Sequence, residues 1–196
     1  MKNANSLLKT RADNADSRIE FLEKELTRTS QYTLNRQLEL HRVPETIGSD
    51  DYADETLKNT VCEALSLTGV AVTPEQIDKC HRLKKKTSVV LEFKQRVQRD
   101  PILHSKKNLK HKKTELERMN LGEMIISESM CQTNRHLDYI CRRLKKRGSI
   151  EDTWFFNGRL WITSAGGKKD QIGHKGDLVR LFGLELIDEM IRAGQT

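Results

Sequence analysis

Residues 77–103, IDKCHRLKKKTSVVLEFKQRVQRDPIL, combine two apolar alternations with a dense run of positive charge. The segment SVVLEFK predicts a strand with one buried face, because every second residue from Val89 to Phe93 is a large apolar one. A preceding strand is predicted through Cys80–Leu83. Asp100-Pro101 predicts the start of a helix, since Asp caps helix N-termini and Pro favours the first helical position. The stretch therefore predicts two adjacent strands followed by a helix.

The neighbouring segments complete this unit on both sides. QLELHRV predicts an earlier strand, and the acidic loop ETIGSDDYADE leads into a helix. TPEQ predicts a capping box with Pro at the first helical position, and EMIISES predicts a last strand. The apolar face of the helix after this acidic loop is expected to consist of Leu57, Val61, Ala64 and Leu65. The order β-α-β-β-α-β over residues 36–127 is typical of ferredoxin-like folds, including the RNA recognition motif.

A second small α+β unit is predicted over residues 128–196. It begins with a long helix from Cys131 to Arg147, and a hairpin follows in which Asn157-Gly158 fits a two-residue type I′ turn. This turn pairs Phe155 with Leu160 and Trp154 with Trp161. Either face of the hairpin is a candidate core face, and we expect at least one tryptophan to lie in the core. A Gly/Lys loop and two helices, around residues 178–182 and 184–191, complete the unit.

The first 35 residues predict a helix that self-associates. Apolar residues recur in alternating steps of four and three, as in the seam of a coiled coil; they are Leu8, Ala12, Ala15, Ile19, Leu22 and Leu26. We expect Ile19, Leu22 and Leu26 to form a dimer or trimer interface, with attractive pairs from Arg11 to Asp16 and from Arg18 to Glu23 across it. The alternative is an amphipathic helix that packs on its own domain.

Positive charge is concentrated in one part of the chain. The formal net charge is +7 and the isoelectric point is about 9.3, which favours a polyanionic partner. Residues 79–113 hold 13 Lys and Arg against two acids, a balance of +11, so the other residues together sum to −4. Such a segment is typical of phosphate binding, whereas an ordinary solvated helix face is the alternative for KKNLKHKK alone.

The first unit is expected to bind nucleic acid without reading its bases. RNA recognition motifs stack bases on aromatic residues of their central strands. Here the corresponding outward positions are Glu39, His41, Val90, Glu92 and Lys94. Without an aromatic platform, backbone contacts should dominate, so binding should be strong at low salt and indifferent to sequence.

The sequence indicates no enzyme, metal site or cofactor. The four cysteines contain no Cys-x-x-Cys pair, and we expect reduced thiols. SAGGKK lacks the phosphate-loop pattern, and Ser127, His136 and His174 have no nucleophile context. Asp50, Asp51 and Asp54 are explained by a helix N-terminus, with a metal-dependent nuclease as a weak alternative. No apolar run spans a membrane and no signal-peptide pattern is present, so we expect a soluble, cytoplasmic protein, with the nucleus as a second location.

An ordered series of segments resembles a known family. These segments are NRQLELHRVPE, IDKCHRLKKKTSVVLEFKQRVQRDPIL, MIISESMCQTNRHLDYICRRLKKRG and TWFFNGRLWI. Over residues 35–190 they resemble the nucleic-acid-binding protein encoded by the first reading frame of LINE-type retrotransposons. They are also similar to the C-terminal part of the baculovirus few-polyhedra (FP) protein. Arg42 departs from the pattern, because the family usually has Gly before V-P-E, and the coiled coil is short.

The resemblance implies a trimeric coiled coil, an atypical RNA recognition motif and a C-terminal domain that closes over single-stranded RNA or DNA. It also implies packaging of RNA into ribonucleoprotein particles, with nucleic-acid chaperone activity. Matched onto this chain, it implies RNA contacts at Arg82, Lys84, Lys94, Arg142, Arg143 and Lys146. The basic segments, the exposed face of the helix over residues 131–147 and the hairpin add Lys85, Arg96, Lys106, Lys107, Arg135 and Arg159 as expected contacts. The rival function is a coiled-coil adaptor of the FP type that acts in virion or vesicle assembly.

Overall fold

The computed structural model describes residues 2–48, 55–83 and 87–192, with side chains described from residue 6 onward. The chain is an α+β protein, as predicted, and divides into two compact units. One unit consists of residues 34–129, and the other joins residues 1–33 to residues 130–196. Among the described helices, none is long and apolar enough to cross a membrane.

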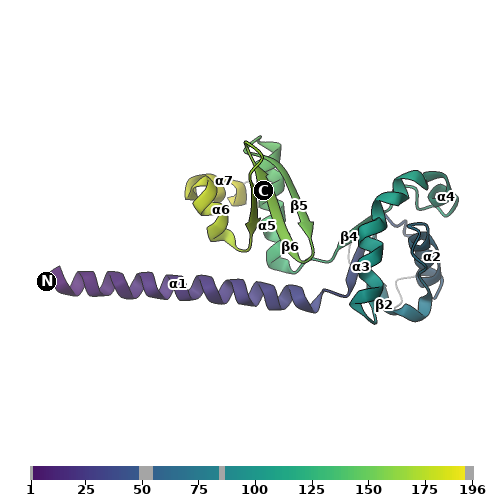
Figure 1. Ribbon diagram of the computed structural model, residues 1–196, viewed down its shortest axis with the longest axis horizontal. Helices are drawn as coiled ribbons and strands as arrows, with labels where there is room; N and C mark the ends of the chain where they lie inside the picture. Colours follow the sequence, from purple (N-terminus) through teal and green to yellow (C-terminus); the bar gives the residue numbers. More distant parts are fainter. Residues whose placement is uncertain (1, 49–54, 84–86, 193–196) are drawn as a thin grey trace. The chain divides into compact units, whose positions relative to one another are not determined.

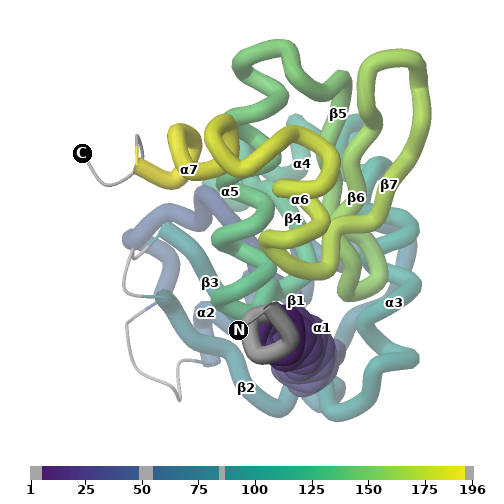
Figure 2. Tube along the Cα trace, turned by 90° about the vertical axis from the view of Figure 1, so that its left-hand side faces the viewer, coloured from purple at the N-terminus to yellow at the C-terminus, as the bar shows by residue number. Residues whose placement is uncertain are grey.

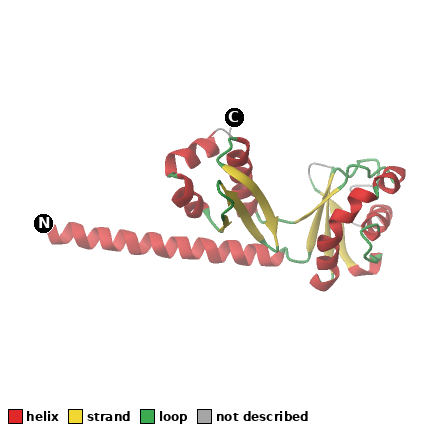
Figure 3. Cartoon of the chain, turned by 45° about the horizontal axis from the view of Figure 1, so that its top comes forward, coloured by secondary structure: helices red, strands yellow, loops and turns green. Residues whose placement is uncertain are grey.

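The unit of residues 34–129 is built on one antiparallel sheet with the strand order β2-β3-β1-β4. Its main elements in chain order are β1 (Gln37–His41), α2 (Glu55–Ser66), β2 (Ile77–Arg82), β3 (Ser88–Phe93), α3 (Arg96–Ser105) and β4 (Ile125–Glu128). Shorter helical segments are η1 (Pro74–Gln76), η2 (Lys106–His111) and α4 (Lys113–Arg118). Helices and strands thus follow the predicted order, and α2 and α3 cover one face of the sheet (Figure 3).

The core of this unit follows from the strand alternation. Val89, Leu91 and Phe93 of β3 are fully buried, which confirms the predicted inward positions. They share one cluster with residues of β1, α2 and α3, among them Leu38, Leu40, Leu57, Val61, Leu65 and Ile102. Because side chains alternate across a strand, the residues between these positions lie on the opposite face.

The start predicted at Asp100-Pro101 for the second helix of this unit is wrong. Helix α3 begins at Arg96, and Pro101 lies inside it rather than at its first turn. The local reason is a reciprocal contact at Gln95, whose main-chain N–H donates to Gln98 Oε1 over 3.0 Å. This contact satisfies one donor at the helix start, so the chain turns helical before the Asp100-Pro101 signal.

The C-terminal part of the other unit packs three helices against a second antiparallel sheet (Figures 1 and 2). Its elements are α5 (Gln132–Lys146), β5 (Ile150–Phe156), β6 (Arg159–Ser164), β7 (Lys169–Ile172), α6 (Lys175–Phe182) and α7 (Leu184–Arg192). The sheet order is β5-β6-β7. Strand β7 lies where the sequence predicted only a Gly/Lys loop. Gly183 separates the last two helices with φ +84°, as its position predicted.

The predicted hairpin register is confirmed. Trp154 pairs with Trp161, and Phe155 pairs with Leu160. Asn157 and Gly158 have φ values of +52° and +73°, the positive values that a type I′ turn requires. The core lies on the face of Leu160 and Ile162, both fully buried, with α5, α6 and α7 packed against it.

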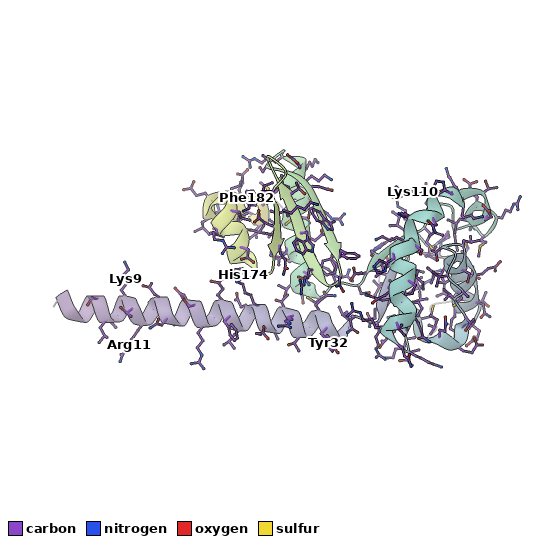
Figure 4. The ribbon with its side chains drawn as sticks, in the orientation of Figure 1. Lys9, Arg11, Tyr32, Lys110, His174 and Phe182 are labelled. Atoms are coloured by element: carbon purple, nitrogen blue, oxygen red, sulfur yellow. The ribbon has the colours of Figure 1, made fainter. Side chains whose placement is uncertain are left out.

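Helix α1 (Lys2–Thr33) docks on the C-terminal elements through polar side chains rather than apolar ones (Figure 4). Gln31 is buried, and its Oε1 accepts hydrogen bonds from Cys131 N and Asn134 Nδ2, each over 2.9 Å. About one turn earlier, Thr27 is also buried, and its carbonyl oxygen lies 3.9 Å from Cys131 Sγ. The sequence pattern did not identify this polar face.

A second polar contact of α1 lies about two turns further toward its start. Glu20 Oε1 is 2.5 Å from Nε2 of the buried His174, which caps α6 by accepting a hydrogen bond from Asp177 N over 2.9 Å. The hydrogen bond from Lys24, with a smaller contribution from His174, holds the pKa of the Glu20 carboxyl at about 2, well below its ordinary value. Glu20, Lys24, Thr27 and Gln31 therefore form one docking stripe at steps of four and three.

The predicted apolar seam lies on another side of α1 and is open. Leu8, Ile19, Leu22 and Leu26 are 60%, 53%, 56% and 69% exposed. A helix whose polar stripe contacts its own unit while its apolar stripe contacts solvent is the reverse of the usual arrangement. The apolar stripe is thus available for a partner, and the alternative of apolar packing on its own domain is not what the structure shows.

Candidate functional site

Part of the positive charge in residues 79–113 is used inside the fold. Arg82, at the end of β2, donates to three main-chain carbonyl oxygens of the turn that follows β1. These belong to Val43 at 3.1 Å, Pro44 at 2.7 Å and Ile47 at 2.5 Å. A guanidinium has a planar array of five N–H donors, which suits such a set of convergent acceptors. Arg82 therefore fastens the turn after β1 to strand β2.

Arg99 is the second cation that the fold uses. Its side chain is buried, contacts the carboxylate of Asp100 and lies 3.5 Å from Glu128 of β4. Arg96, one of the predicted RNA contacts, is exposed but donates to the same Asp100 over 3.0 Å. A buried charge requires such partners, because removing it from water unpaired is costly.

Other cations of this segment remain accessible. Lys94, Lys106 and Lys107 are exposed, although Lys106 Nζ lies 3.4 Å from the carbonyl oxygen of Ile126. Within residues 2–48, 55–83 and 87–192, Lys94 and Lys107 have no carboxylate at ion-pair distance. Two further predicted contacts, Lys84 and Lys85, lie outside the described residues, as do Asp50, Asp51 and Asp54 of the acidic loop.

The face of the first sheet turned away from α2 and α3 offers hydrogen bonds and charge rather than large aromatic rings. The strand registers place Glu39, His41, Lys79, His81, Val90, Glu92 and Ser127 on it. Burial, aided by the ammonium of Lys79, lowers the pKa of His81 below its ordinary value. The imidazole of His81 is thus neutral at physiological pH and adds no positive charge. None of these seven residues is Phe, Tyr or Trp, so the imidazoles of His41 and His81 are the aromatic rings among them.

Helix α5 carries a basic stripe opposite a buried, mainly apolar face. Leu137, Ile140, Cys141 and Leu144 are buried against the second sheet, and burial raises the pKa of the Cys141 thiol to about 12. The helix contains five Lys and Arg against one acid, Asp138. Its predicted RNA contacts are Arg135, Arg142, Arg143 and Lys146, of which Arg143 is half-buried and the others are exposed.

Three of these four side chains are oriented by neighbours. Arg142 Nε is 2.6 Å from the Asp138 carboxylate one turn earlier. Arg143 donates to the Tyr139 hydroxyl over 2.7 Å and lies 5.5 Å from the centre of its ring. Arg135 donates to the carbonyl oxygen of Met130 over 2.9 Å. Basic residues in a last helical turn also complement the helix dipole, which explains part of the stripe but not Arg135.

The hairpin presents its two tryptophans on the face away from the core. The expectation that at least one of them lies in the core is wrong, because both are half-buried and neither belongs to the core cluster. The rings of Trp154 and Trp161 are within 10° of parallel, with centroids 6.4 Å apart. Helices α5, α6 and α7 occupy the other face of the sheet, so the indoles have no helix of this cluster to pack on.

Strand β7 adds a cation to the same face. Lys169 Nζ lies 5.9 Å from the ring centre of Trp154, within the range of cation–π attraction. Arg159, the predicted contact in the hairpin, is exposed on this face, where it pairs with Phe156. Lys169 was missed because KDQI has a single large apolar residue and therefore no clear strand signal.

The comparisons with known proteins add no assignment. No protein-family model matches the chain, and a search of curated proteins finds no significant match. The functional interpretation thus depends on the residues and their geometry. Within the described ranges, no three His, Cys, Asp or Glu side chains gather in a way that would hold a metal ion.

The different environments of two predicted contacts lead to a stability test. Replacing Arg82 by Ala removes the guanidinium donor from three carbonyl oxygens, of which that of Pro44 still accepts from the N–H of Ile47. We therefore expect the free energy of unfolding to fall by about 1–3 kcal/mol. Lys94→Ala removes an exposed side chain and should change it by less than about 0.5 kcal/mol. Urea denaturation of the full chain, followed by circular dichroism, measures both. Equal losses in the two variants would contradict the structural role of Arg82.

Proposed function

We propose that residues 34–129 form a ferredoxin-like domain of the RNA-recognition-motif type. Two observations support this assignment. The elements follow the order β-α-β-β-α-β, and the strands are arranged β2-β3-β1-β4 with antiparallel neighbours. The seven positions named above include no Phe, Tyr or Trp, which makes the domain atypical, because base stacking on this sheet is left to the imidazoles of His41 and His81.

The geometry of one turn supports kinship with the LINE-type first-reading-frame proteins. In that family Gly usually precedes V-P-E, and here the equivalent Arg42 has a φ of +62°, a conformation that Gly adopts at little cost. The carbonyl oxygens of Val43 and Pro44, within V-P-E, accept hydrogen bonds from Arg82 of the H-R-L strand. Two segments that carry the resemblance therefore meet in one structural feature.

The function that these features support best is non-enzymatic binding of single-stranded nucleic acid. The observation that carries it is the basic stripe of α5, where Arg135, Arg142 and Lys146 are exposed opposite a buried face. Together with the accessible Lys94 and Lys107, these side chains are suited to phosphates rather than base edges. Binding that neutralises phosphates and ignores sequence fits a protein that coats RNA in ribonucleoprotein particles and acts as a chaperone.

Removal of the stripe tests this function. The triple variant Arg142→Gln, Arg143→Gln, Lys146→Gln should weaken binding of a labelled single-stranded RNA by at least tenfold at low salt, because three phosphate contacts are lost. The matched control Lys9→Gln, Arg28→Gln, Arg118→Gln removes the same charge from exposed positions outside α5 and outside the charge pairs of the α1 seam, and it should have a much smaller effect (Figure 4). Fluorescence anisotropy measures both affinities.

The comparison between these two triple variants decides the outcome. Equal weakening in both would show that only net charge matters and would reject α5 as the interface. Unchanged binding in the α5 variant would also reject it. A thermal melt followed by circular dichroism checks that each variant remains folded, since the replaced side chains lie outside both core clusters.

We further propose that α1 joins two or three copies of the chain through its apolar stripe. Ile19, Leu22 and Leu26 are more than half exposed, and burial of such a seam is the usual driving force for coiled coils. A second copy fits this face better than an unrelated partner, because the flanking pairs Arg11 with Asp16 and Arg18 with Glu23 are complementary between identical helices.

The oligomer is tested through its mass. The variant Ile19→Ala, Leu22→Ala, Leu26→Ala should convert the oligomer to a monomer in multi-angle light scattering, because the buried seam is lost while helix propensity is retained. The control Thr10→Ala, Asn14→Ala, Ser17→Ala changes exposed polar positions of the same helix that lie off the seam, and it should leave the mass unchanged. A native protein of monomeric mass would contradict the interface.

The rival is a structural adaptor of the FP type, in which α1 provides the function. It is favoured by the use of Arg82 and Arg99 within the fold, which reduces the charge available to a polyanion. An oligomer of the expected mass that does not bind single-stranded RNA would establish this rival.

A further inference from the structure

The two tryptophans form an aromatic surface that the fold itself does not need. Large aromatic side chains provide more burial energy than most residues, and they are usually placed in a core or an interface. Here Trp154 and Trp161 are half-buried, lie outside the core cluster, and stack on each other on the outer face of the sheet. Such a pair is typical of a surface that binds a planar ligand.

We propose that Trp154 and Trp161 stack against bases of a bound single strand, which makes the β5-β6-β7 sheet a base-binding face. This inference rests on the proposed nucleic-acid binding and adds a contact of a different kind. The interaction of α5 with phosphates depends on charge, whereas the indole pair would bind the bases through their planar faces. The first sheet lacks such rings at its seven named positions, so the second sheet takes the role of stacking platform.

The register identifies the residues of this face. Alternation along β5, β6 and β7 places Asp152, Trp154, Phe156, Arg159, Trp161, Thr163, Lys169 and Gln171 on the same side. Asp152 is the acid among them, and its carboxylate is tied to Lys145 Nζ at 2.6 Å. The Lys145 ammonium lowers the pKa of Asp152, so the pair remains ionised and neutral overall. Arg159 and Lys169 then leave this face with a net positive charge.

Charge and aromatic rings together favour nucleic acid over other occupants. A base stacked on an indole places its phosphates at the edge of the ring, where cations such as Arg159 and Lys169 can reach them. Lys169 already lies 5.9 Å from the centre of the Trp154 ring. The stacking is expected to tolerate any sequence, because every base has a π face. This agrees with the sequence-independent binding proposed above.

The composition of the chain makes the test direct. The sequence contains two tryptophans, and both belong to this pair, so the intrinsic tryptophan emission reports on this face alone. The full-length protein is titrated with a single-stranded oligonucleotide and, separately, with an abasic oligonucleotide of equal length and charge. Anisotropy of an end label measures binding, and tryptophan emission measures stacking in the same sample.

Stacking predicts that the base-bearing strand quenches the tryptophan emission and that the abasic strand does not, even when it is bound. The base-bearing strand should also bind roughly tenfold more tightly, as expected for the loss of base–aromatic contacts. Equal affinities with unchanged emission would overturn the base-binding face while leaving the proposed function intact. Failure of both strands to bind would overturn the two together.

Variants separate stacking from indirect effects. Trp154→Leu and Trp161→Leu should each bring the affinity for the base-bearing strand toward that for the abasic strand, whereas Trp161→Phe should retain most of it. The control Tyr32→Leu removes an aromatic ring that is 72% exposed on α1 and should change neither affinity. Emission changes with anionic lipid vesicles and none with the oligonucleotide would assign the face to a membrane surface and reject base binding.

Discussion

Positive charge that leaves water must be paired within the protein, and this constraint decides which cations of the chain remain for a partner. Arg99 is buried between Asp100 and Glu128, and Arg82 is fastened to the carbonyl oxygens of a turn. Both guanidinium groups are engaged within the domain, so we do not expect them to bind phosphate. The sequence shows a single basic segment, but the structure divides it into cations that hold the domain together and cations, such as Lys94 and Lys107, that point into solvent.

Helix α1 also divides its side chains between internal contacts and solvent. Its polar side chains contact the chain's own unit, and its apolar side chains are exposed. Gln31 and Glu20 attach the helix to the C-terminal elements through hydrogen bonds, so the apolar seam is not buried in the chain's own core. A helix held in this way can join copies and remain attached to the unit for which we propose nucleic-acid binding. If α1 oligomerises, several α5 stripes would act on one strand, and their effective concentration would raise the affinity without new contacts.

Sequence reasoning succeeded where the decisive interactions are local. The strand of Val89 and Leu91 follows from alternation, and the register of the hairpin follows from Asn157-Gly158, whose turn type fixes which residues pair. It failed where distant residues decide. The partner of Gln31 lies 100 residues away at Cys131, and no pattern in α1 alone reveals it. Likewise, alternation separates the two faces of the hairpin but does not say which face the later helices cover, so the position of Trp154 and Trp161 required the structure.

We thus propose two kinds of contact with one polyanionic ligand: phosphates would contact the positive charge of α5, and bases would contact the aromatic rings of the second sheet. They differ in their response to salt, because stacking does not release counterions whereas phosphate neutralisation does. The most direct test is the affinity for single-stranded RNA between low and moderate salt. Neutralisation of about four phosphates predicts a line of slope about −3 when log K is plotted against log salt concentration. An affinity that barely changes with salt would contradict the account.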